Sequence, residues 1–313
     1  MEEEENKKLI PRKSTELAVT RPGASRILET IVTDSLAIAS SQIYPELVEE
    51  DVSGRGISAY QSINPDLQIM RCNMNVLTSL NLSYTPNLTH IFCDINQITK
   101  LDLSRTTKLR NLDCNFNRLT ELDLSYNPEL ESLICFTNQM TRLILSNNTK
   151  LFELICGDNR LTELDLSATS GLKKLLCSNN QLTNLDLSHN PELLILYCNS
   201  NQLTELDLSH TQELKDLFCN GNQLTGLDLS NTPKLEQLFC SGNQLTKLDL
   251  SHVPSLRRLG CADNQITELD LRGLPKLNEL ACENNPQSKI VCYRSQAERF
   301  SLRDHPGLVI ASS

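Results

Sequence analysis

The sequence has no tryptophan and few other aromatic residues, with six tyrosines and seven phenylalanines among 313 residues. It contains no run of about 18 consecutive apolar residues, the length that a membrane-spanning helix needs. Residues 1–30 lack the apolar core of a secretory signal peptide. We therefore expect no membrane partner and a cytoplasmic location.

Basic residues are outnumbered by acidic ones. The chain has 29 Lys and Arg against 39 Asp and Glu, which gives a formal net charge of −10 and a pI near 5.1. Proteins that bind a phosphate backbone need clustered Lys and Arg. We therefore expect no nucleic-acid partner.

The familiar signatures of catalysis and metal binding are also missing. There is no glycine-rich phosphate loop, no His-Glu-x-x-His, no Gly-x-Ser-x-Gly and no Cys-x-x-Cys pair. We expect no catalytic residue, no metal site and no cofactor. One alternative stays open, an enzyme that uses one of the twelve cysteines as its nucleophile.

What the sequence does have is a cysteine every 21 residues, followed three positions later by an asparagine. A fixed period of about 20–30 residues is typical of stacked-repeat solenoids. The cysteines are Cys72, Cys93, Cys114, Cys135, Cys156, Cys177, Cys198, Cys219, Cys240, Cys261 and Cys282, and the asparagines run in step from Asn75 to Asn285.

Six positions in each unit carry the predicted core; counted from the cysteine they are −5, −2, 0, +5, +8 and +10. The Leu-x-Cys and Leu-Asp-Leu segments alternate with the two-residue period of strands, so the stacked units predict two parallel ladders and a gently curved array. We expect the asparagine at +3 and the aspartate at +9 to bind backbone groups at the two turns.

The cysteines themselves are predicted to be buried and free. Stacking places equivalent side chains about 4.8 Å apart and pointing the same way, whereas a disulfide needs Cβ atoms about 3.8 Å apart and facing each other. The thiols should therefore serve as small apolar core groups.

The unit Leu-x-x-Leu-x-Cys-x-x-Asn-Gln-Leu-Thr-x-Leu-Asp-Leu-Ser resembles the 21-residue, cysteine-bearing repeats of internalin J and similar bacterial leucine-rich-repeat proteins. The resemblance covers residues 67–293. It implies a β-rich, right-handed leucine-rich-repeat solenoid with a buried cysteine ladder and a concave sheet that recognises proteins. The sequence lacks a signal peptide, a cell-wall sorting motif and an adhesive stalk. This favours a cytosolic protein, or an effector translocated into the cytosol of a host cell, over a surface adhesin.

The rest of the chain is divided as follows. We expect a flexible tail at 1–12, a helical N-terminal cap with a degenerate half repeat at 13–66, the array at 67–293 and a C-terminal cap at 294–313. Apolar residues at helical spacing predict a helix over 24–40, and a shorter one over 45–50. These helices would cover the open end of the solenoid. In an alternative, they recruit a second partner and the protein is an adaptor.

The candidate binding site comes from the position just before each cysteine, which should point outward. Seven of its eleven residues are large and apolar, and six of the thirteen aromatics lie there or at the next two outward positions. Such a stripe is typical of an interaction surface, although the rings could instead only support one another across strands. The sequence predicts a monomeric, non-catalytic module that binds a protein through Phe92, Phe116, Ile134, Phe136, Ile155, Leu176, Tyr197, Phe218 and Phe239.

Overall fold

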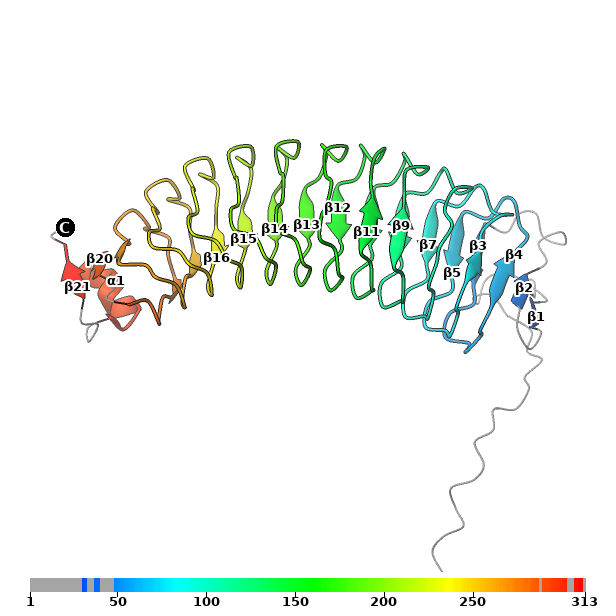
Figure 1. Cartoon of the computed structure of the whole chain (residues 1–313), viewed down its shortest axis with the longest axis horizontal. Coiled ribbons are helices and arrows are strands. Elements are labelled where there is room, and N and C mark those ends of the chain that lie inside the picture. Colours follow the sequence, from blue (N-terminus) through cyan, green and yellow to red (C-terminus); the bar gives the residue numbers. More distant parts are fainter. Residues whose placement is uncertain (1–29, 33–36, 40–47, 287–288, 303–306, 312–313) are drawn as a thin grey trace, which may run out of the picture.

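The computed structural model describes residues 30–32, 37–39, 48–286, 289–302 and 307–311, and the first two segments by their backbone alone. Within this range the chain is a stack of similar coils that forms one gently curved arc (Figure 1). The predicted flexible tail at 1–12 lies outside the described residues.

The arc is built on a parallel sheet of twelve strands, one from each coil. Between most neighbours the register is an offset of 21 residues, so that Leu217 pairs with Leu238. The strands are β3 (Glu49–Asp51), β5 (Ile69–Arg71), β7 (His90–Phe92), β8 (Asn111–Asp113), β10 (Ser132–Ile134), β12 (Glu153–Ile155), β13 (Lys174–Leu176), β14 (Ile195–Tyr197), β15 (Asp216–Phe218), β16 (Gln237–Phe239), β17 (Arg258–Gly260) and β19 (Glu279–Ala281).

The second predicted ladder is present only in pieces. The described strands on this side are β4 (Tyr60–Ser62) with β6 (Leu80–Asn81), β9 (Glu121–Asp123) with β11 (Arg142–Ile144), and β18 (Glu268–Asp270) with β20 (Lys289–Cys292) and β21 (Leu308–Ile310). From 164 to 250 the equivalent segments have no strand, yet their leucines, such as Leu185 and Leu187, remain buried. Apolar burial therefore holds this side of the coil without a continuous ladder.

The helical part of the predicted N-terminal cap is wrong wherever the structure describes it. β1 (Thr30–Val32) and β2 (Ala37–Ala39) are antiparallel strands, and β2 continues in parallel with β4. The segment is rich in β-branched residues, which favour strands, and the edge of β4 can accept one. The second predicted helix is replaced by β3, which pairs with β5. Residues 24–29, 33–36 and 40–47 lie outside the described range.

The array therefore begins one coil earlier than predicted, because its first coil hides the pattern. Glu50 occupies a position that holds an apolar residue in the next coil, Met70, and its side chain is only 2% exposed. Its carboxyl group accepts hydrogen bonds from the hydroxyls of Tyr60 and Ser62. A polar group buried in this way needs such partners.

In the regular coils, leucine and cysteine form one continuous core. Of the ladder cysteines, all but Cys282 are fully buried, and the described cysteines are free, as predicted. The asparagine at +3 joins successive coils. The Nδ2 of Asn180 donates to the carbonyl oxygens of Cys156 and Cys177, both at 3.1 Å, while its Oδ1 accepts the N–H of Leu161 at 3.0 Å. This confirms the predicted role of the asparagine ladder.

The C-terminal end is covered by α1 (Arg294–Arg299) and β21 (Figure 1). The buried amide of Gln296 donates to the carbonyl oxygens of Leu271, at 2.7 Å, and Leu274, at 3.3 Å. Ala297 packs into the core with 2% exposure. The helix thus binds carbonyl groups of the last regular turn and fixes itself to the end of the stack.

Candidate protein-interaction surface

Strand alternation turns the residue before each cysteine outward, as predicted. Cys219 is fully buried while its neighbour Phe218 is half-buried. Six of the nine predicted residues form one unbroken line of in-register neighbours across β10, β12, β13, β14, β15 and β16. We call Ile134, Ile155, Leu176, Tyr197, Phe218 and Phe239 the apolar column.

The aromatic end of the apolar column is a closed stack. The ring centroids of Tyr197 and Phe218 lie 4.2 Å apart with the planes tilted by 51°, and those of Phe218 and Phe239 lie 4.6 Å apart at 18°. Neighbouring rings therefore lie on both sides of Phe218. A partner would meet ring edges rather than open faces, which favours apolar contact over cation–π stacking.

The stack ends at β17, where a glycine makes room for it. A Cβ placed on Gly260 would lie 2.6 Å from the Cδ1 atom of Phe239, closer than real contacts allow. The guanidinium of Arg258 sits 5.1 Å from the centre of the Phe239 ring. Neither residue is among the predicted site residues, although the only glycine at this position of the repeat was a usable signal.

A line of paired polar side chains runs beside the apolar column, at position −3. Glu153 accepts from Ser132 Oγ at 2.8 Å and from Lys174 Nζ at 2.9 Å. Further along, Asp216 accepts from Gln237 Nε2 at 2.9 Å, and Gln237 Oε1 accepts from Arg258 at 2.8 Å. A polar rim beside an apolar centre is typical of protein interfaces.

One apolar residue, Ile195, interrupts this polar line. It occupies position −3 on β14, two residues before Tyr197, and it is half-buried. Both side chains point to the same side of the sheet. The apolar surface is therefore widest around Tyr197.

The remaining three predicted residues lie apart from the apolar column. Phe92 is separated from Ile134 by Asp113, which pairs with both in the sheet register. The guanidinium of Arg71 lies 4.3 Å from the centre of the Phe92 ring. Phe116 and Phe136 form an edge-to-face pair with centroids 5.0 Å apart, in the turns that follow β8 and β10. The structure thus divides the predicted site into the apolar column, Phe92 on β7 and the Phe116–Phe136 pair.

The aspartates on this face are not ordinary surface carboxylates. Burial raises the pKa of Asp113 to about 6, and the negative charge of Asp94 adds to the effect. Burial also raises the pKa of Asp216, which lies beside the apolar column. The outward face of the large sheet is thus partly shielded from water.

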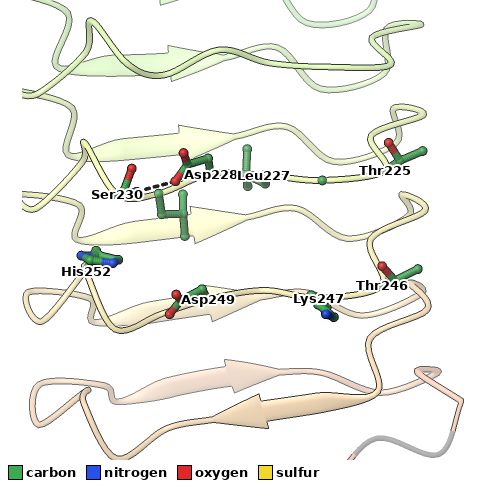
Figure 2. Close-up of a pocket in the computed structure, with 10 residues that line it drawn as sticks. Thr225, Leu227, Asp228, Ser230, Thr246, Lys247, Asp249 and His252 are labelled. Carbon is green, nitrogen blue, oxygen red and sulfur yellow. Dashed lines mark hydrogen bonds between the residues drawn. The ribbon is translucent and has the colours of Figure 1, made fainter.

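On the opposite side of the coils, which we call the broken-ladder side, polar and charged side chains lie between successive coils (Figure 2). A shallow hollow lies around Gly226, between successive coils that carry Asp228, Lys247 and His252. Asp228 Oδ1 accepts the N–H of Ser230 at 2.9 Å, and the same aspartate-to-turn bond recurs along the stack, as predicted. Across the described residues there is no group of three or more His, Cys, Asp or Glu that could hold a metal ion.

The buried thiols have the opposite property to an activated nucleophile. Burial raises the pKa of Cys177 and of Cys240 to about 12. The half-buried Cys282 has a pKa of about 11. A reactive cysteine is exposed and has a lowered pKa, so the ladder speaks against the alternative of a cysteine nucleophile.

Together, the 21-residue period, the parallel sheet and the buried cysteines define a leucine-rich-repeat solenoid with a cysteine ladder. A family model described as leucine-rich repeats, two copies, matches residues 212–252. No curated protein sequence matches the chain significantly. In the described part of the chain, no helix has the length and apolar character to cross a bilayer.

Several solved structures of leucine-rich-repeat proteins are similar to this chain. The functional domain of InlJ from Listeria monocytogenes, which includes a cysteine ladder, has 31% sequence identity and a TM-score of 0.73, and the match covers 85% of this chain but only 64% of that one. YopM, a leucine-rich effector protein from Yersinia pestis, has 25% identity and a TM-score of 0.66 over 84% of this chain and 78% of its own. An internalin, InlF, from L. monocytogenes has the same fold at 24% identity, with a TM-score of 0.71 over 81% and 78% of the two chains.

Proposed function

We propose that the chain is a non-catalytic module that binds a protein partner on the outward face of its large sheet. The observation that carries the proposal is the apolar column, six in-register residues that stay half-exposed beside a line of paired polar groups. Apolar patches of this kind mark interaction surfaces, and aromatic residues are common binding anchors.

The chemistry of the rest of the molecule supports binding rather than catalysis. The ladder thiols are buried with raised pKa values, and the hollow around Gly226 is shallow. The acidic net charge of −10 disfavours a nucleic-acid partner. We therefore propose a monomer with a protein partner.

The similarity to a leucine-rich effector protein supports a narrower proposal. The protein would act in the bacterial cytoplasm, or in the cytosol of a host cell after translocation, where its free thiols stay reduced. No described feature favours the adaptor alternative, because the residues of its recruiting helices that the structure describes are strands.

The test uses the column itself. The partner is first captured with the wild-type chain in a pull-down. A variant with Phe218→Ala and Phe239→Ala should then bind this partner about 2 kcal/mol more weakly than wild type, roughly 30-fold in Kd. The matched control is Tyr126→Ala, because Tyr126 is 57% exposed and lies in a turn on the other side of the coils. Equal affinity of the double variant and wild type in calorimetry would refute the proposal.

A further inference from the structure

The outward line of the large sheet contains one carboxylate between apolar residues. On β8, Asp113 pairs with Phe92 of β7 on one side and with Ile134 of β10 on the other. Apart from Asp113, the line is apolar from β7 to β16, and a protonated Asp113 would leave it without a charge. The edge-to-face pair of Phe116, which is exposed, and Phe136, which is half-buried, lies in the turns that follow β8 and β10. Asp113 therefore separates the apolar column from Phe92.

The carboxylate of Asp113 has only neutral partners. Its Oδ1 accepts the backbone N–H of Asn115 at 3.3 Å and the side-chain amide of Asn115 at 2.5 Å. Among the described residues, no cation lies within ion-pair distance of it. Burial raises its pKa to about 6.

The charged groups around Asp113 do not offset its charge. On the β7 side stand His90, whose pKa is lowered by burial, and Asp94, whose negative charge opposes ionisation of Asp113. Just before β8, Arg110 is paired with Glu131 at 3.5 Å. One strand further, Arg71 is paired with Glu49 at 2.8 Å. Strand β10 itself carries no ionisable side chain.

We propose that Asp113 controls, through its protonation, how far a partner extends along the outward face of the large sheet, which we call the docking face. The ionised form confines an apolar partner segment to the apolar column. The protonated form lets that segment extend to Phe92. This rests on the proposed function of the face. A partner that covers Asp113 removes water from the carboxyl group and so favours the protonated form.

The sign of the pH dependence follows from proton linkage. Because the covered state holds a proton that the free state loses above its pKa of about 6, binding takes up one proton near neutral pH. Affinity therefore rises as the pH falls, by at most about tenfold per pH unit, and levels off once the free carboxyl group is protonated.

The experiment uses Nile red, an uncharged dye whose fluorescence reports accessible apolar surface, on the full chain between about pH 8 and about pH 5. For wild type, dye fluorescence should rise as the pH falls, with a midpoint near pH 6. Asp113→Asn, which is neutral at every pH, should show the high signal throughout and no step. Circular dichroism at both ends of the range checks that each variant stays folded.

Two control variants separate Asp113 from its neighbours. His90→Gln should keep the step at the wild-type midpoint. Asp94→Asn should keep the step but move its midpoint to lower pH, because a like charge has been removed. A flat wild-type curve, or a step that survives in Asp113→Asn, overturns the proposal.

Failure of this inference is distinguishable from failure of the proposed function. Suppose that the double variant Phe218→Ala and Phe239→Ala loses partner affinity at about pH 8 while Asp113→Asn still shows the wild-type step. Binding on the docking face is then supported, and the role of Asp113 is refuted. If that double variant binds like wild type, the docking face itself is refuted.

Discussion

The two outward sides of each coil are made from the same repeat but differ in what they keep constant. On the side of the broken ladder, the Leu-Asp-Leu-Ser segment recurs almost unchanged, and each aspartate serves its own turn. On the large sheet, the outward residue changes from coil to coil, from Phe92 to Asp113 to Ile134. Constant positions are used by the coil itself, whereas the variable positions are the ones we propose for contact with a partner.

The aspartates show this difference most directly. The hydrogen bonds from Ser104 lower the pKa of Asp102, which faces water on the broken-ladder side. Burial beside apolar residues raises the pKa of Asp113 on the large sheet. The same side chain is thus a stable turn former on one side and a group that protonates near neutral pH on the other.

The largest predicted effect comes from replacing a side chain that binds several backbone groups in the turn after a large-sheet strand. We compare it with a turn-binding aspartate on the opposite side of the coil, where the second ladder is broken. Asn222 donates to the carbonyl oxygens of Cys198 and Cys219 and accepts the N–H of Leu203. Asn222→Ala would leave these buried groups unpaired and should lower the free energy of unfolding by about 3 kcal/mol or more in urea denaturation. Asp228→Ala, whose carboxylate is exposed, should cost only a small fraction of that. Similar losses of unfolding free energy in the two variants would contradict the idea that the buried asparagine stabilises the coil more than the exposed aspartate.

A second comparison uses one glycine from each side. Gly260→Ala places a Cβ against the Phe239 ring, so the ring must move and the stack loosen, at a cost of about 1 kcal/mol. At Gly226 an added Cβ meets nothing within 4 Å. Gly226→Ala should therefore be neutral, or stabilising by about 0.5 kcal/mol through the unfolded chain. Thermal unfolding of both variants measures the two changes in stability. If Gly260→Ala is as stable as wild type, the Phe239 ring is not held tightly against this strand.

The smallest predicted effect concerns acid stability on the broken-ladder side. Asp102 has a lowered pKa in the folded state, so its contribution is present above the unfolded pKa of about 3.9 and is lost as the pH falls through the folded value. Asp102→Asn should therefore narrow the difference in unfolding free energy between about pH 7 and about pH 3. An unchanged difference would mean that its bonds to Ser104 add nothing.

The sequence came closest to the structure where local pattern and packing agree. Strand alternation alone places Phe218 outside and Cys219 inside, and the asparagine at +3 binds backbone groups of its own turn and of the preceding coil. It failed at 30–32 and 37–39, inside the helix predicted over 24–40, where β1 and β2 instead extend the edge of β4. The first coil escaped notice because Glu50 stands in an apolar position.

By itself, the sequence determined the coil, the cysteine ladder and the direction in which each strand residue points, because a period of 21 residues fixes them within one repeat. Only the tertiary structure decided how side chains meet between coils. Phe239 could stack because Gly260 lies beside it, Glu50 could be buried because Tyr60 and Ser62 face it, and Asp113 acquired its raised pKa from burial and from Asp94. These effects depend on contacts and desolvation between residues of different strands, which a repeat pattern does not encode.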